Sequence, residues 1–179
     1  MLHEGPSATG EVTSVRPELE IENRVRRVLA RLGLPYEAIP IDAAYADTAA
    51  FCERYGFPLD HSVNTIIVGS KKEPKQYCAC LVLATTRLDV NHTVRRLMGV
   101  PRASFASAED TIGLTGMLIG GVTVFALPPE LPIYVDERIV ALDYVILGGG
   151  SRSLKVKVPP AVLERLPSMR VVHGLGVGL

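Results

Sequence analysis

The amino-acid sequence predicts one α+β domain, because segments with helical spacing of apolar residues alternate with short β-rich runs in no repeating order. The chain has 179 residues, enough to bury roughly 70% of its unfolded surface around a single core. No internal repeat occurs, and no linker separates two apolar regions. We therefore expect residues 18–179 to form the domain. Residues 1–17 mix Gly, Pro, Ser, Thr and Glu without an apolar period, which predicts a flexible N-terminal tail.

The first elements follow from spacing and from residues that begin or end helices. Apolar positions three and four apart predict an amphipathic helix over residues 18–32, ended by Gly33. Residues 36–41 alternate as a short strand. Asp47 and Thr48 offer a cap for a helix that runs to residue 55.

Two β-rich runs then predict neighbouring strands. Residues 63–68 and 77–84 are separated by a polar connection typical of a hairpin. Cys78 and Cys80 lie two positions apart in the second run, so both thiols are expected on one face, buried and inert.

The second half alternates in the same way. Asn91 can cap one helix, and Ser107 with Asp110 resembles a capping box that opens another. Further short strands are expected at residues 133–135, 144–147 and 154–158. Pro159 and Pro160 then begin a last helix.

Composition excludes several classes of protein. Lys plus Arg and Asp plus Glu number 19 each, so no global field attracts nucleic acid and any RNA contact must be local. Two basic groups are candidates for that contact, namely Lys71, Lys72 and Lys75, and Arg95, Arg96 and Arg102. The three cysteines fit a reducing cytoplasm better than a disulfide framework or a zinc site. No uninterrupted apolar run is long enough for a membrane span.

The most informative segment is the apolar run from Thr115 to Pro128, which contains three glycines and two threonines. Glycine weakens a strand held only by packing, so its presence indicates that something approaches the backbone. Paired glycines such as Gly120 and Gly121 also expose successive N–H groups that can bind an anion. The segment is therefore a candidate oxyanion hole. The structural alternative is a bulge or a tight bend in a sheet.

Together with Asn64–Val68 upstream and Gly148–Lys155 downstream, this segment resembles the YbaK/ProX family of aminoacyl-tRNA editing domains. The resemblance covers about residues 21–166 in order and spacing. It implies a mixed, barrel-like β-sheet surrounded by helices. It also implies hydrolysis of the ester between a mischarged amino acid and tRNA, with no metal or organic cofactor.

The resemblance, together with the departures from it described below, predicts a set of site residues around the glycine loop. The residues expected to act on the ester are Gly120, Gly121, Val122, Asn64 and Lys155. The residues expected to contact the substrate are Thr65, Tyr45, Met117, Ile119, Thr123, Gly149, Gly150 and Ser151. The backbone N–H groups of the loop would hold the oxyanion.

Three positions depart from the family pattern. Asn64 stands where the family carries a lysine, and Val124 stands where the loop usually has proline. Lys155 stands where the family commonly has an aspartate after the Gly-Gly turn. One hypothesis is that the Lys155 amine replaces the missing one. The alternative is that Lys155 and Lys157 share a solvated strand face.

Two functions follow from the resemblance and these departures. The first is a stand-alone, cytoplasmic trans-editing deacylase that removes a small mischarged amino acid from tRNA, with an aminoacyl-tRNA synthetase as a further partner. The second is a non-catalytic module that binds aminoacyl-tRNA or a small aminoacyl ligand, because Asn64 replaces the family lysine.

Overall fold

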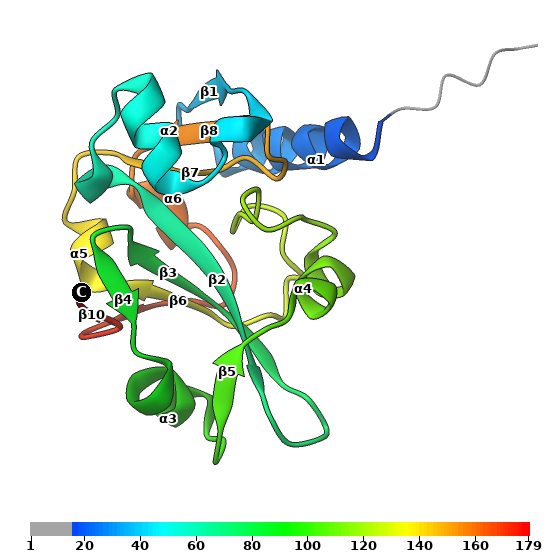
Figure 1. Cartoon of the computed structure of the whole chain (residues 1–179), viewed down its shortest axis with the longest axis vertical. Coiled ribbons are helices and arrows are strands. Elements are labelled where there is room, and N and C mark those ends of the chain that lie inside the picture. Colours follow the sequence, from blue (N-terminus) through cyan, green and yellow to red (C-terminus); the bar gives the residue numbers. More distant parts are fainter. Residues whose placement is uncertain (1–15) are drawn as a thin grey trace, which may run out of the picture.

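A five-stranded mixed sheet forms the centre of the protein, in a computed structural model that describes residues 16–179 (Figure 1). Its strands, in spatial order, are Ala103–Phe105 (β5), Val63–Ser70 (β2), Tyr77–Leu83 (β3), Ile133–Asp136 (β6) and Met169–Val172 (β9). β2 pairs antiparallel with β3 and β5, whereas β3, β6 and β9 run parallel. The pairing of β2 with β3 confirms the predicted hairpin.

Two smaller sheets complete the strands. Glu37–Pro40 (β1), Leu154–Val158 (β8) and Val145–Gly148 (β7) form an antiparallel three-stranded sheet, and Gly176–Gly178 (β10) pairs with Thr86–Leu88 (β4). A bridge between Ser62 and Ile146 connects the three-stranded sheet to the start of β2. The α+β class and the mixed pairing are confirmed, although the strands form three sheets rather than one barrel-like sheet.

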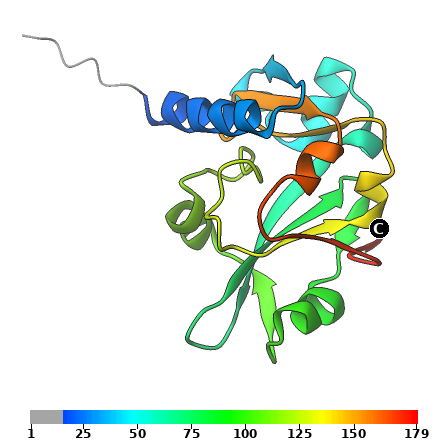
Figure 2. The same ribbon diagram turned by 180° about the vertical axis from the view of Figure 1, so that it is seen from behind.

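Helices surround the sheets. They are Pro17–Leu32 (α1), Thr48–Tyr55 (α2), Arg95–Met98 (α3), Ala108–Thr115 (α4), Glu137–Val140 (α5) and Ala161–Glu164 (α6). Single turns lie at Ala43–Tyr45 (η1), Leu59–His61 (η2) and Val90–Val94 (η3, a π-helical turn). The longest helix, α1, runs along the three-stranded sheet (Figure 2) and buries Val25 and Leu29 fully. It ends at Gly33, as the sequence predicts.

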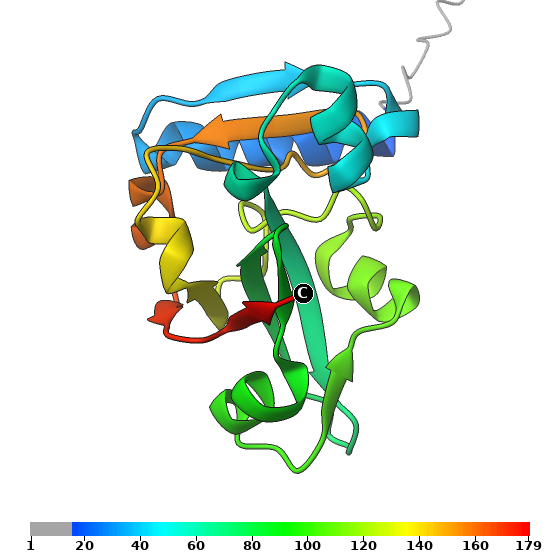
Figure 3. The same cartoon turned by 60° about the vertical axis from the view of Figure 1, so that its left-hand side comes forward.

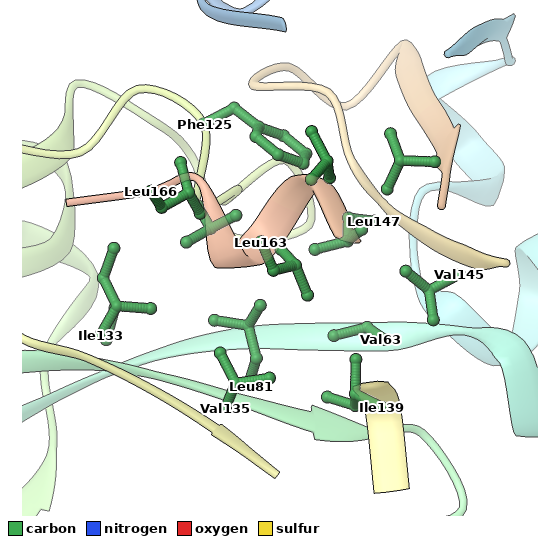
Figure 4. Close-up of a cluster of buried hydrophobic side chains, with 14 of the residues drawn as sticks. Val63, Leu81, Phe125, Ile133, Val135, Ile139, Val145, Leu147, Leu163 and Leu166 are labelled. Atoms are coloured by element: carbon green, nitrogen blue, oxygen red, sulfur yellow. The ribbon is translucent and has the colours of Figure 1, made fainter. Parts of the chain in front are cut away.

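The main hydrophobic core holds the two larger sheets together (Figure 4). Leu81 and Val135 come from the central sheet, Leu147 comes from β7, and Leu163 of α6 lies among them. Phe125 of the glycine-rich segment is 1% exposed and belongs to the same cluster. Burying a side chain of this kind stabilises the fold by about 1.5–3 kcal/mol. The core therefore fixes β2 relative to the sheet that carries β8, and residues of both strands line the site described below.

Some elements differ from the sequence prediction. The cap before α3 is Asp89, whose carboxylate accepts hydrogen bonds from the Thr93 backbone N–H (3.1 Å) and hydroxyl (2.8 Å), while Asn91 is exposed. Helix α5 and strands β4, β5, β9 and β10 were not predicted, because a segment of three or four residues shows little periodicity of its own. Helix α1 begins at Pro17, one residue before the predicted start at residue 18, and residues 1–15 of the predicted tail lie outside the described residues.

Candidate functional site

A cavity of about 360 Å³ opens between β2, the start of α2 and the glycine-rich segment. The predicted site residues that line it are Asn64, Thr65, Ile119, Gly120, Val122 and Lys155. They come from three separate parts of the chain, and the packing of β8 beside the glycine-rich segment brings them together. We call this space the site cavity.

Lys155 is the buried cation of the site cavity. It lies on β8 and is only 6% exposed, so the alternative of a solvated strand face is wrong for this residue. Its Nζ donates a hydrogen bond to the carbonyl oxygen of Ala46 (2.7 Å) and lies 3.5 Å from that of Gly120. The ring of Phe51, 5.6 Å from Nζ, gives further support on the inner side.

The environment of Lys155 weakens its hold on a proton. Burial is the main reason that the pKa of this ammonium group falls from 10.5 to about 8; Cys52 and Asp47 oppose the change, and Arg152 contributes a smaller decrease. At neutral pH the group is still mostly charged. An ammonium has three donors, and two of them are directed at carbonyl oxygens. The third has no acceptor among residues 16–179 and is available to a ligand in the cavity.

Asn64 lies on β2 at the same cavity. Its side-chain oxygen accepts a hydrogen bond from the hydroxyl of Thr48 at 2.7 Å. Thr48 is the first residue of α2, so this bond fixes the amide orientation with its oxygen toward the helix. Within residues 16–179 the amide nitrogen of Asn64 has no acceptor, and it is a neutral donor for a ligand.

Thr65 adds a further polar group. Its hydroxyl oxygen is buried and has no hydrogen-bond partner among the described residues. A buried hydroxyl without a partner costs roughly 1–3 kcal/mol. Because Thr65 lines the site cavity, a ligand there can supply the missing partner.

The glycine loop offers fewer free N–H groups than its sequence suggests. The N–H of Gly121 donates to the carbonyl oxygen of Leu118 at 2.9 Å, so it closes a turn and is not a free oxyanion donor. The N–H groups of Gly120 and Val122 have no acceptor among residues 16–179, and both residues line the cavity. They remain the backbone candidates for holding an oxyanion.

The glycines also serve packing. A Cβ on Gly121 would lie 2.6 Å from the carbonyl carbon of Ser151, and one on Gly148 would lie 2.6 Å from the carbonyl oxygen of Val122. The N–H of Gly150 donates to the oxygen of Gly121 at 2.9 Å. What approaches this backbone is therefore the second glycine-rich segment, and the contact places Gly120 beside Lys155.

Several predicted substrate contacts lie outside the site cavity. Tyr45 packs edge-on against Tyr55 (6.4 Å between ring centres), and Met117 and Thr123 are buried in the loop interior. Gly149 lies against the side chain of Leu154, and Gly150 against α1. The hydroxyl of Ser151 donates to Glu22. These residues shape the loops behind the cavity, as does Val124, which is 2% exposed in the main core.

Other residues at the cavity were not predicted. Thr48, Thr111 and Phe105 line it, and Phe105 is 57% exposed at its edge. The guanidinium of Arg152 covers Gly120 and donates to the carbonyl oxygen of Ile119 at 2.9 Å. Arg152 belongs to the Gly-Gly-Gly-Ser-Arg-Ser motif, and its position in this motif is the sequence feature that could have indicated its place at the cavity.

Comparison with known proteins identifies the family of the chain and supports its fold. A profile of the aminoacyl-tRNA editing domain family matches residues 42–166. The fold is similar to a crystal structure described as a candidate trans-editing enzyme for prolyl tRNA synthetase, with 25% sequence identity, a TM-score of 0.76, and 92% of this chain and 100% of that chain covered. It is also similar to the crystal structure of a hypothetical protein, with 23% identity, a TM-score of 0.76, and 86% and 99% covered.

The chain therefore belongs to the aminoacyl-tRNA editing domain family, which confirms the resemblance seen in the sequence. In the described part of the chain, no three His, Cys, Asp or Glu side chains gather in a way that would hold a metal ion. Over residues 16–179, no helix has the length and apolar character needed to cross a membrane.

Proposed function

We propose that this protein is an aminoacyl-tRNA deacylase that acts on its own and hydrolyses the ester of a small mischarged amino acid. The observation that carries the proposal is the buried Lys155 ammonium at the wall of the site cavity, 3.5 Å from the oxygen of Gly120. Asn64 lines the same cavity. A cation in the cavity supports the hypothesis that Lys155 replaces the amine missing at position 64.

The proposed reaction uses electrostatic stabilisation. A water molecule adds to the carbonyl carbon of the ester, and the carbonyl oxygen takes up the negative charge. The ammonium of Lys155 and the N–H groups of Gly120 and Val122 stabilise that oxygen. The bond from carbon to the ribose oxygen then breaks, and the proton from the water passes to the ribose oxygen. The products are a free amino acid and a tRNA with a free terminal hydroxyl.

A small side chain fits the size and lining of the site cavity. Its volume is about 360 Å³, near the lower end of ligand pockets, and it must also admit part of the ribose. Val63 and Ile67 provide apolar wall, while Thr65 and Thr111 provide polar wall. Alanine, serine and cysteine esters are the substrates to test first.

The alternative function is a non-catalytic module that binds aminoacyl-tRNA. It is favoured by one observation: Asn64 is neutral, and its oxygen is already bonded to Thr48. A charge-assisted hydrogen bond lost at this position is worth about 1.5–3 kcal/mol. Turnover separates the two functions, whereas affinity does not.

The experiment measures hydrolysis of tRNAs carrying alanine, serine or cysteine by the wild type, Lys155→Ala and Lys157→Ala. Lys157 is the matched control, because it lies on the same strand but packs over the ring of Tyr144, 4.2 Å away and outside the site cavity. We expect the wild type and Lys157→Ala to hydrolyse one ester, and Lys155→Ala to lose about 10²- to 10³-fold in kcat.

Absence of hydrolysis by the wild type on every ester, with binding retained, would establish the binding module instead. Equal hydrolysis by Lys155→Ala and the wild type would remove Lys155 from the mechanism while leaving the deacylase intact. A Gly121→Pro variant is a poorer test, because that N–H closes a turn and its loss disturbs the whole loop.

A further inference from the structure

A second cavity, of about 710 Å³, is lined by residues of β4, β5 and η3. Figure 3 shows the backbone of the face that carries these elements. The residues that matter in it are Lys71, Arg87, Asn91, His92 and Phe105. We call it the basic groove. It is separate from the site cavity, but the two share one lining residue, Phe105.

Phe105 is the aromatic residue between the two cavities. It is the last residue of β5, pairs with Val68 of β2, and is 57% exposed. A phenylalanine ring this open gains little from packing, and its exposure is not needed for the fold. A ring in this position offers a flat apolar face to any ligand that extends from the site cavity into the groove.

The cations of the groove come from segments far apart in the sequence. Lys71 lies at the start of the β2–β3 connection, and its backbone N–H donates to the oxygen of Arg102 at 3.1 Å. The two basic groups noted in the sequence therefore meet at this point. Arg87 of β4 lines the groove, and Lys71, Arg87 and Arg102 are all exposed.

One acid, Asp89, also lines the groove. Its carboxylate accepts hydrogen bonds from the backbone N–H and hydroxyl of Thr93 and interacts with His92 at 3.1 Å. These bonds turn its oxygens toward the chain. The exposed charged side chains that line the groove, Lys71 and Arg87, are positive.

We propose that the basic groove binds the unpaired 3′ end of an RNA strand, with a base stacked on Phe105 and phosphates held by Lys71 and Arg87. This inference rests on the proposed function, because an ester in the site cavity requires the attached strand to leave past the cavity edge. Single-stranded nucleic acids are held by aromatic faces together with cations along the backbone. Asn91 and Ser104 add polar groups to the same wall.

The test measures binding of a fluorescent single-stranded RNA without an attached amino acid. It has about six nucleotides and ends in CCA, which is within the usual site sizes for such strands. Because this probe carries no amino acid, its affinity does not depend on hydrolysis. The full chain is compared with Phe105→Ala, Phe105→Tyr, the double variant Lys71→Ala/Arg87→Ala, and Arg27→Ala. Arg27 is the charge control, since it is exposed on α1.

We expect Phe105→Ala to weaken binding roughly 5- to 150-fold and Phe105→Tyr to bind as the wild type does. The double variant is expected to reduce the slope of log K against log salt by about 1.4, since each cation contributes about 0.7 on a single strand. Arg27→Ala should change neither quantity.

Two results would overturn the inference: unchanged RNA affinity in every groove variant, or hydrolysis of aminoacyl-tRNA by a wild type that does not bind the strand. The proposed function fails in a different way. RNA binding that depends on Phe105, without hydrolysis of any ester, would keep the groove and remove the deacylase.

Discussion

At the scale of single residues, the positive charge of the site cavity is on a different strand from the one that carries it in the family pattern. Position 64 on β2 carries a neutral amide, while the ammonium of Lys155 enters from β8. Both residues line the site cavity. The sequence identified both positions, because both depart from the family pattern. It left the direction of Lys155 open, since strand alternation alone does not say which face of a short strand is covered.

Moving the lysine from position 155 to position 64 tests whether one ammonium group in the cavity is sufficient for activity. We expect Asn64→Lys in the wild type to lower kcat, because two ammonium groups in one cavity repel each other and lower each other's pKa. The same substitution in a Lys155→Ala background should restore activity at least tenfold. Deacylation of the best ester by all four proteins measures this. Failure of the second lysine to rescue would show that Lys155 acts from a geometry that position 64 cannot reproduce.

The pH dependence of the reaction follows from the same group. The pKa of Lys155 is lowered to about 8, so the ammonium is present below pH 8 and is lost as the pH rises above it. We expect kcat/KM, corrected for uncatalysed hydrolysis, to fall above about pH 8. A rise through the same range, reported by a pH series from 6 to about 9.5, would instead make the neutral amine a general base.

At the scale of elements, two glycine-rich segments support each other. Residues 118–121 form a turn, and the segment at 148–151 packs against it backbone to backbone. Arg24 of α1 adds a clamp, because its guanidinium donates to the carbonyl oxygens of Thr115 (3.2 Å) and Ala126 (2.8 Å). The loop conformation therefore depends on contacts distant in the sequence.

Alanine substitutions separate glycines needed for packing from those that are not. Gly121→Ala is expected to destabilise the fold by about 1–3 kcal/mol, because its Cβ would overlap Ser151. Gly113→Ala is the control. A Cβ there meets nothing within 4 Å in α4, so the change should stabilise the protein by about 0.5–1 kcal/mol. Urea unfolding of both variants and the wild type measures the sign of each change in the free energy of unfolding.

Most elements were predictable because their signals are local. The end of α1 at Gly33 and the cap of α4 at Ser107 are determined by neighbouring residues, and the β2–β3 hairpin is determined by two β-rich runs. The parallel pairing of β3, β6 and β9 was not predictable, since no local pattern encodes which distant strands meet. Tyr45, Met117 and Ser151 were expected at the substrate but lie outside the site cavity, because the sequence does not fix the direction of a side chain.

At the scale of the whole molecule, the buried ammonium opposes folding. Lowering the pKa of Lys155 from 10.5 to about 8 means that the folded protein binds fewer protons than the unfolded chain between these values. The free energy of unfolding therefore rises with pH through that window. The effect is about 3 kcal/mol in total.

Replacing Lys155 should remove this dependence. We expect Lys155→Met to slow hydrolysis about 10²- to 10³-fold, while its free energy of unfolding changes less than that of the wild type between pH 8 and 10.5. Urea unfolding at pH 7 and near pH 10 measures the difference. Identical pH dependence in the two proteins would show that the ammonium is better solvated than its 6% exposure indicates.

The three cysteines allow local and global unfolding of the protein to be measured by thiol labelling. All are buried, but Cys78 and Cys80 lie in the central strand β3, whereas Cys52 is in α2 beside the site cavity. The contact with Cys78 and burial raise the pKa of the Cys80 thiol well above its ordinary value, which keeps it protonated and unreactive in the folded state. A thiol reagent should therefore label β3 only on global unfolding, and Cys52 on smaller openings of α2. The ratio of the two labelling rates measures how much more often α2 opens locally than the whole protein unfolds.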